Sequence, residues 1–149
     1  MKYNISDYRI ENRPFVNGEY IKPNAHETVH KISSVTGEML PELFVCNKQD
    51  VDYAVSIARK TFSSGIWNKL SPQIRKETML KLADLMEEHK LELATLDTVE
   101  TGRAFQNYLC DSIPKAIEAV RYFAEAVDKI YDQAITPRED SFCVVVREA

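Results

Sequence analysis

The sequence predicts a mainly helical α+β fold: β-hairpin elements at the N-terminus, four helical segments and one C-terminal strand. Three observations carry this prediction. Apolar residues recur every three or four positions through most of residues 48–131, which is typical of helices with one packed side. Short alternating stretches separated by turn residues fill the first 46 positions. The β-branched run Val144-Val145-Val146 near the end of the chain favours a strand.

Composition indicates an ordered globular protein and excludes several classes of function. The 149 residues are 44% hydrophobic and 28% charged, which is enough for one domain with a real core. The net charge of −4 is mixed along the chain, so nothing predicts binding to nucleic acid or to an anionic membrane. No apolar run approaches the ~20 residues that span a bilayer, and the polar N-terminus lacks a signal-peptide core. We therefore expect a cytoplasmic protein.

The first third of the chain predicts small antiparallel β structure. Residues 1–14 are of mixed polarity and are interpreted as an N-terminal arm. Asn17-Gly18 between two apolar pairs predicts a hairpin, because both residues tolerate positive φ. Residues 27–32 alternate and predict a strand, and residues 40–46 could return it as a second one.

Two helices are predicted from their start and stop signals. Asn47 is a good N-cap for a first helix, which the turn around Gly65 ends. Ser71 followed by Pro72 predicts the start of the second helix, because proline suits the first helical position.

The second helix could either break or continue at residues 87–90. Residues 91–100 are helical again, and Gly102 suits a C-terminal cap. The longest pattern follows, at residues 104–131, whose apolar stripe predicts one helix on which the shorter helices pack. Pro114 lies inside it and should bend it.

The segment Ser141–Glu148 predicts a strand without an obvious partner, because nothing in the chain follows it. It must pair with the N-terminal strands, with another chain, or not at all. An apolar strand with an open edge is a site of association.

No active site can be identified from residue types and spacing alone. The four glycines are too far apart for a phosphate-binding loop. His26 and His30 could share a strand face, but a metal site needs further ligands, so surface histidines are favoured, and His89 lies far away. The odd number of cysteines argues against a disulfide framework, and buried inert thiols are expected. The cysteines are Cys46, Cys110 and Cys143.

Two further features have competing interpretations. Asp111, Glu118 and Glu125 recur every seven residues on one helix side, where a solvated face is favoured over a paired-carboxylate site. Trp67 is the only tryptophan, and an anchor for the loop between the first two helices is favoured over a ligand platform.

An ordered set of short motifs nevertheless resembles the N-terminal third of the NAD(P)-dependent aldehyde dehydrogenases. The resemblance covers about residues 13–148. The matching pieces are Phe15-Val16-Asn17-Gly18-Glu19, Thr36-Gly37-Glu38, Asp50-Val51-Asp52, Ala54-Val55, Ala58-Arg59, Trp67, Pro72, Arg75, Leu82-Ala83-Asp84-Leu85, Glu100-Thr101-Gly102-Arg103, Arg121-Tyr122-Phe123-Ala124 and Val146-Arg147-Glu148. Residues 82–87 and 122–129 are most similar to the branch that oxidises γ-glutamyl-γ-aminobutyraldehyde and related aminoaldehydes.

The resemblance implies that the complete enzyme oxidises an aldehyde to the acid with NAD or NADP. A cysteine thiolate would attack the aldehyde, hydride would pass to the nicotinamide, and a glutamate would activate water against the thioester. The family motifs for the nucleophile, the base and the cofactor are absent, so we assign no catalytic and no cofactor-binding residue and expect this chain to be inactive alone. The family continues Arg-Glu-Pro-Val-Gly where this chain ends Arg147-Glu148-Ala149. We therefore expect a chain truncated before the catalytic domain.

Two roles can be transferred by residue. Many family members hold Na⁺ or K⁺ with a backbone carbonyl and an aspartate, which match Ile32 and Asp111, and a further ligand lies beyond this chain. Residues 15–139 would form part of the helical cofactor domain, and residues 140–149 a strand of the oligomerisation domain. We expect self-association through Phe142–Glu148 and exposed helix faces.

Three hypotheses for function follow. The chain is a piece of an aldehyde dehydrogenase, a stand-alone non-catalytic interaction module, or an unrelated helical protein that shares the pattern.

Overall fold

The computed structural model of the chain describes residues 10–24 and 27–145, and its elements follow the predicted order. In chain order they are β1 (Phe15–Val16), β2 (Glu19–Tyr20), β3 (Thr28–Val29), β4 (Leu43–Phe44), α1 (Lys48–Ser64), α2 (Pro72–Glu88), α3 (Lys90–Thr101), α4 (Phe105–Asn107), the π-helical turn η2 (Tyr108–Ser112), α5 (Ile113–Ala126), β5 (Gln133–Arg138) and β6 (Ser141–Val145). The mainly helical α+β prediction is confirmed.

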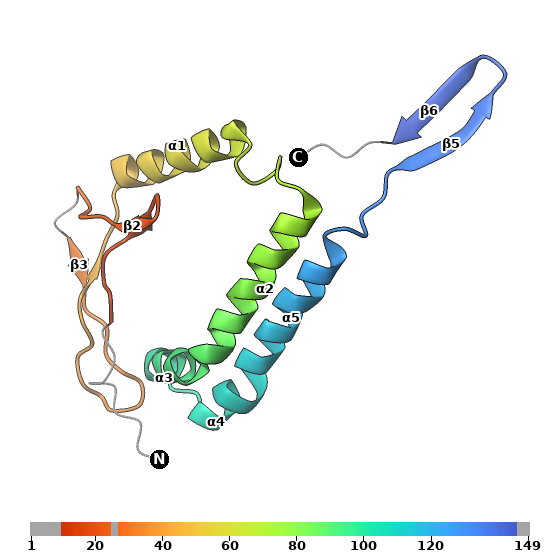
Figure 1. Cartoon of the computed structure of the whole chain (residues 1–149). Helices are drawn as coiled ribbons and strands as arrows, with labels where there is room; N and C mark the ends of the chain where they lie inside the picture. The colour runs from red at the N-terminus through yellow and green to blue at the C-terminus, as the bar shows by residue number, and fades with distance from the viewer. Residues whose placement is uncertain (1–9, 25–26, 146–149) are drawn as a thin grey trace.

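The long helices α2 and α5 form the centre of the molecule. They lie side by side and run antiparallel, with α3 and α4 at one end of the pair (Figure 1). Helix α1 and the N-terminal strands lie on one side of this pair, and the β5–β6 hairpin projects from the other (Figure 1).

The hydrophobic core lies where α2, α3 and α5 meet. Ala83 and Ala94 are fully buried, and Ile113 and Ile117 are nearly so. Two alanines at the centre let the helix backbones approach closely, and the isoleucines fill the remaining space. The half-buried side chains around them are Met86, Leu93, Phe105, Tyr108, Leu109 and Val120.

The predicted caps of α1 and α2 are confirmed. The side-chain oxygen of Asn47 accepts hydrogen bonds from the backbone N–H groups of Gln49 and Asp50, at 2.8 and 3.0 Å. The Asp50 carboxylate accepts from the Asn47 N–H at 3.0 Å, which completes a capping box. Gly65, at φ 78°, ends α1 in the left-handed conformation. Ser71 Oγ accepts from the backbone N–H of Ile74 at 3.3 Å and so caps α2.

At residues 87–90 the helix breaks rather than continues. Helix α2 ends at Glu88 and α3 starts at Lys90, with His89 between them at φ −96° and ψ 14°. The turn lets α3 cross the end of the α2–α5 pair and bring Ala94 into the core (Figure 1).

The predicted helix at 104–131 is helical from Phe105 to Ala126 and contains a local irregularity just before Pro114. The N–H of Ile113 bonds the carbonyl of Tyr108, five residues back, which makes a π-helical turn. Proline has no N–H to donate to the preceding turn, so an irregular hydrogen-bond pattern at this point has a direct cause.

The predicted end of this helix, at Tyr131, was wrong by five residues. Lys76 on the first turns of α2 contacts Glu125, so α5 reaches the end of its neighbour at about Ala126. Beyond that point the apolar stripe has no helix to pack on, and Ile130 and Tyr131 are exposed. Helices of this length depend on packing more than on propensity, so the helix stops where packing stops.

The N-terminal hairpins are confirmed, with strands shorter than predicted. Strand β1 pairs with β2 around Asn17 and Gly18, at φ 57° and 84°, as a type I′ turn requires. Strand β3 pairs with β4, and an isolated bridge between Ile32 and Met39 extends the ladder.

The strand near the C-terminus has a partner that the sequence analysis missed. Strand β6 pairs antiparallel with β5, the segment directly before it, and not with the N-terminal strands. The hydrophobicity pattern did not predict β5, because Pro137 and polar residues interrupt its apolar residues. The register of the β5–β6 pair shifts between Ile135 and Arg138. The end of the predicted strand, residues 146–148, lies outside the described residues.

Candidate functional site

Ile32, the first predicted cation ligand, lies on the bridge to Met39. The hydrogen bonds flanking this pair run from Leu40 N to the Lys31 carbonyl at 2.8 Å and from Ser33 N to the Glu38 carbonyl at 2.9 Å. Ile32 and Met39 are therefore a non-hydrogen-bonded pair, and the carbonyl of Ile32 points away from the neighbouring strand. Such a carbonyl is available to a ligand.

Asp111, the second predicted ligand, already has a cation beside it. Lys115, one helical turn later, pairs with its carboxylate at 2.6 Å and holds the pKa of Asp111 below its ordinary value. Two oxygen ligands are fewer than the six or so that hard cations take in proteins. The Ile32–Asp111 cation site stays a prediction.

The acidic residues of the long helix lie on a solvated face. The side chains of Asp111 and Glu125 are 49% and 53% exposed, and each pairs with lysine rather than with another carboxylate. Glu118 between them is exposed. This arrangement favours the solvated face over a paired-carboxylate site.

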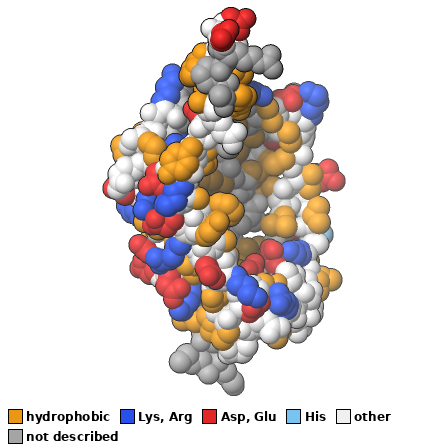
Figure 2. All heavy atoms as spheres, turned by 90° about the vertical axis from the view of Figure 1, so that its right-hand side faces the viewer, with side chains coloured by type: hydrophobic (Ala, Val, Ile, Leu, Met, Phe, Trp, Pro, Cys, Tyr) orange, Lys and Arg blue, Asp and Glu red, His pale blue; other side chains and the backbone are white. Residues whose placement is uncertain are grey.

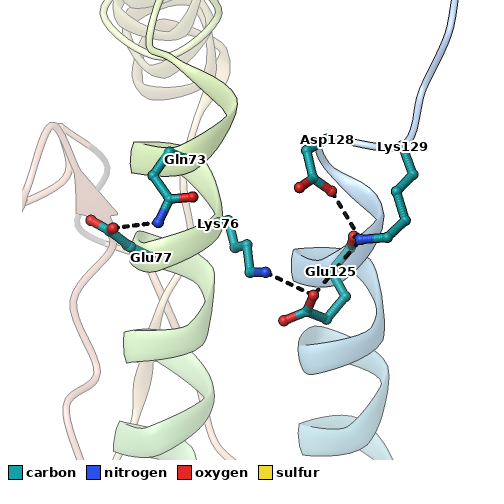
Figure 3. Close-up of polar contacts among 6 residues, drawn as sticks. All are labelled: Gln73, Lys76, Glu77, Glu125, Asp128 and Lys129. Atoms are coloured by element: carbon teal, nitrogen blue, oxygen red, sulfur yellow. Dashed lines mark hydrogen bonds and ion pairs between the residues drawn. The ribbon is translucent and has the colours of Figure 1, made fainter.

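At the upper end of the helix pair a small ionic cluster links α2 to α5 (Figure 3). Lys76 on α2 donates to Glu125 at 2.7 Å, and this contact lowers the pKa of the Glu125 carboxyl. Lys129 bonds Asp128 at 2.9 Å, which lowers the pKa of Asp128 and raises that of Lys129. These groups are open to solvent, so the cluster orients the two helices more than it stabilises them.

The expectation of buried cysteines was wrong. Cys46, Cys110 and Cys143 are all exposed. Cys110 lies on the outer side of η2, where its Sγ donates to Gln106 Oε1 at 3.2 Å. Cys143 lies on β6 of the two-stranded β5–β6 hairpin, where all five residues from Ser141 to Val145 are exposed.

The described histidines make surface contacts. His30 lies 3.3 Å from Glu42, and His89 lies 3.2 Å from Glu92. His26 falls outside the described residues. Among the residues that are described, no group of three or more His, Cys, Asp or Glu side chains could hold a metal ion.

Trp67 lines an apolar groove between the β1–β2 hairpin and α1. The groove encloses about 680 Å³, and its walls include Phe15, Ile57 and Phe62. The buried Asp50 carboxylate accepts from the N–H and side-chain amide of Asn24, at 2.9 and 2.7 Å, and so ties the segment after the hairpin to the start of α1. Sequence reasoning placed Trp67 in the loop but missed the groove, because the hairpin and the helix are separated by 27 residues.

The face that carries α5 and the β5–β6 hairpin shows hydrophobic side chains in several groups, with charged side chains between them (Figure 2). Tyr122 and Phe123 on α5 are 69% and 60% exposed, and Phe142 on β6 is 72% exposed. A helix with the length and hydrophobicity of a membrane span is not found within residues 10–24 and 27–145.

Comparisons of this chain with known proteins all indicate the same family. The model of the "Aldehyde dehydrogenase family" matches residues 20–149. The NADP/NAD-dependent aldehyde dehydrogenase PuuC of Escherichia coli is 42% identical over 139 residues, which are 93% of this chain and 28% of PuuC. The aminoacetaldehyde dehydrogenase of Pseudomonas aeruginosa is 34% identical with the same coverage.

Solved structures of aldehyde dehydrogenases are also similar to this chain. The aldehyde dehydrogenase KauB from Pseudomonas aeruginosa superposes with a TM-score of 0.87 at 39% identity, over 92% of this chain and 28% of that one. The γ-glutamyl-γ-aminobutyraldehyde dehydrogenase from Burkholderia cenocepacia gives 0.85 at 32% identity, over 89% of this chain and 27% of that one.

The chain thus spans little more than a quarter of the length of these relatives. The match removes the hypothesis of an unrelated helical protein. The hairpins, the capped helices and the long interrupted helix of this chain are those of a known architecture, and the chain belongs to the aldehyde dehydrogenase family.

Proposed function

We propose that this chain supplies the N-terminal helical scaffold of an NAD(P)-dependent aldehyde dehydrogenase and is not catalytic by itself. The observation that carries the proposal is the 42% identity to PuuC along 93% of the chain. The whole enzyme would oxidise an aldehyde to its acid, with a cysteine nucleophile, a general base and the nicotinamide cofactor.

The thiols of this chain are poor candidates for that nucleophile. A reactive thiolate needs a nearby cation or a general base. Cys110 donates to a neutral amide, that of Gln106, rather than to a general base. Cys46 and Cys143 are exposed without a base bonded to them in the described part of the chain. We therefore assign no catalytic residue here.

Aminoaldehydes are the substrate class we propose for the whole enzyme. Two relatives with this chemistry in their names, the aminoacetaldehyde dehydrogenase and the γ-glutamyl-γ-aminobutyraldehyde dehydrogenase, match along about nine tenths of the chain. The same two stretches that resembled this branch, residues 82–87 and 122–129, lie on α2 and at the end of α5.

Calorimetric titration with NAD⁺ and an aldehyde oxidation assay test this proposal directly. The 149-residue chain should bind no NAD⁺ at micromolar concentration and should form no NADH with an aminoaldehyde, while PuuC serves as the positive control. Micromolar NAD⁺ binding by this chain would contradict the proposal. The DNA that follows the Ala149 codon distinguishes the proposed scaffold from a stand-alone interaction module. If that DNA encodes Pro-Val-Gly in any reading frame, it supports the scaffold.

The β5–β6 hairpin favours a second role, self-association. Ile135 and Phe142 are 52% and 72% exposed, and Val144 and Val145 are nearly half exposed. A two-stranded hairpin is marginal in water, and its open edge can pair with a further strand. We propose that Phe142–Glu148 and the Tyr122-Phe123 face of α5 contact a second copy, although residues 146–148 lie outside the described chain.

Light scattering coupled to size-exclusion chromatography tests self-association. The chain should elute as a dimer or larger at micromolar concentration, and Val144→Lys should shift it toward monomer. Val55→Lys, at a more exposed valine on α1 (59% against 43% for Val144), is the control and should leave the mass unchanged. A monodisperse monomer of the unmodified chain contradicts this role.

The cation site needs its own test. We propose that Na⁺ or K⁺ bound by the Ile32 carbonyl and Asp111 raises the Tm relative to N-methylglucamine chloride at equal ionic strength, and that Asp111→Asn removes the difference. Equal Tm values in the three salts contradict the site.

A further inference from the structure

The groove between the β1–β2 hairpin and α1 has the size of a small-molecule site. Its volume of about 680 Å³ lies within the range of about 300–1,000 Å³ that is usual for ligand pockets. Phe15 and Val16 line it from the hairpin, and Ala54, Ile57 and Phe62 line it from α1. Asn47 and Asp50 hold the start of α1 in place, so one wall of the groove is a capped helix rather than a loop.

The aromatic walls of this groove are open to solvent. Phe15, Phe62 and Trp67 are 61%, 49% and 45% exposed. Covering aromatic surface of this kind is favourable, at roughly 25 cal/mol per Å² of apolar area removed from water. An apolar molecule inserted between the hairpin and the helix would cover three rings at once.

A positive charge lies at one end of the groove. A second pocket of about 230 Å³ adjoins it, because Asn17, Ile57 and Thr61 line both. Lys60 lines this second pocket and is the only charged side chain among the described residues that line either one. Within the described chain, Lys60 takes part in no ion pair, unlike Lys48 at the other end of the same helix, which pairs with Asp52.

We propose that this groove binds an amphipathic monocarboxylate. Its apolar body would lie between Phe15, Phe62 and Trp67, and its carboxylate would meet the ammonium group of Lys60. This follows from a mostly apolar groove beside which Lys60, without an ion pair in the described part of the chain, supplies a positive charge. It does not depend on the proposed dehydrogenase role, because none of these residues is given a part in oxidation.

Octanoate is a suitable probe, because Trp67 is the only tryptophan in the chain and reports on the groove directly. Titration with octanoate should change the tryptophan emission saturably, with a Kd of about 0.1–1 mM for a ligand of this size. Octanamide, which has the same shape without the charge, should bind severalfold more weakly. The contact with Lys60 is exposed, so a larger effect is not expected.

Matched variants locate the site. Lys60→Gln should weaken octanoate binding about threefold and abolish the preference over octanamide, whereas Lys81→Gln, on α2, should change neither. Ala58→Leu narrows the groove and should weaken binding at least fivefold, whereas Ala119→Leu, on α5, should not. Both alanines are exposed on helices, where leucine is well tolerated.

Several outcomes would overturn the proposal. One is the absence of a saturable change in Trp67 emission together with no amide chemical-shift changes at Asn17, Gly18 and Ile57. A second is chemical-shift changes on α5 or the β5–β6 hairpin alone. A third is equal binding of octanoate and octanamide that Lys60→Gln leaves unaltered. A fourth is a shift of the Trp67 emission on dilution without ligand, which would assign the groove to a second copy of the chain.

Discussion

The α2–α5 pair and the α1 region are held in place by different interactions. Helices α2 and α5 share a core around Ala83 and Ile117 and are linked by ion pairs such as Asp84–Arg121 at 2.8 Å. Helix α1 has one buried residue, Asp50, and the interactions that fix its start are its N-terminal cap and a hydrogen-bonded link to Asn24. The first region depends on tertiary packing and the second on local backbone signals, so the two should respond differently to substitution.

The largest effect is expected from emptying the shared core. Ile117→Ala removes a side chain that is 5% exposed and should lower the free energy of unfolding by about 2–5 kcal/mol, through lost burial and the remaining cavity. Urea denaturation followed by circular dichroism measures it. The control Ile135→Ala, at a site 52% exposed on β5, should cost less than about 0.5 kcal/mol. Equal costs would show that the core is not where the structure places it.

The next effect tests the contact between the N-terminal region and the end of α3. At Gly102, with φ 78°, an added Cβ would lie 2.8 Å from Cβ of Ser34, so Gly102→Ala should cost about 1–3 kcal/mol. Gly37→Ala, at φ 73° with open space around it, isolates the backbone cost of about 1 kcal/mol. Urea midpoints of both variants measure the difference. If Gly37→Ala proves as costly as Gly102→Ala, the contact with Ser34 contributes nothing.

Removing a helix cap distinguishes the two regions more finely. Asn47→Ala and Ser71→Ala each delete an N-cap, so each should cost about 1 kcal/mol. The local consequence should differ: α1 should fray and exchange its amide hydrogens faster, because little packing holds it, whereas α2 should stay protected by α5. Hydrogen exchange read residue by residue checks this. Similar protection of α1 and α2 in the two variants contradicts the comparison.

The smallest effect concerns the ionic cluster at the end of the helix pair. Lys76 lowers the pKa of Glu125, so this carboxyl stabilises the fold at pH values above its unfolded pKa, and the contribution is lost as the pH falls through the lowered value. Lys129, whose pKa is raised by Asp128, contributes at neutral pH and loses its contribution as the pH rises through that raised pKa.

Glu125→Gln should therefore slightly reduce the urea midpoint at pH 7, and this reduction should disappear as the pH falls through the lowered pKa of Glu125. Glu118→Gln, at an exposed position on the same helix, is the control. High salt should reduce the difference at pH 7, because the pair is exposed. A difference between Glu125→Gln and the unmodified chain that persists at low pH would assign the effect to packing.

Much of the fold follows from local chemistry. Asn17-Gly18, Asn47, Ser71-Pro72 and Gly102 mark where a turn or a helix begins or ends, because each satisfies a backbone requirement within a few residues. The predicted features that failed were the end of α5, the partner of β6 and the burial of the cysteines. Each depends on what lies beside the segment in space, which no local pattern specifies.

The candidate sites likewise depend partly on residues that the sequence identifies and partly on contacts that form only in the folded chain. A ligand groove could not be predicted from Phe15, Lys60 or Trp67 separately, because it exists only where the hairpin lies over α1. The ligands Ile32 and Asp111 were transferred from the family resemblance, and the contact between Asp111 and Lys115 became visible only in the folded helix.

By itself, the sequence determined the family, the order of the elements and the caps that start them, since these depend on residue type and spacing along the chain. The tertiary structure alone decided where α5 ends, which strand pairs with β6 and how the hairpin and α1 enclose a groove. The physical reason is the range of the interactions: caps and turns act over a few residues, whereas burial and strand pairing depend on neighbours that are distant in sequence.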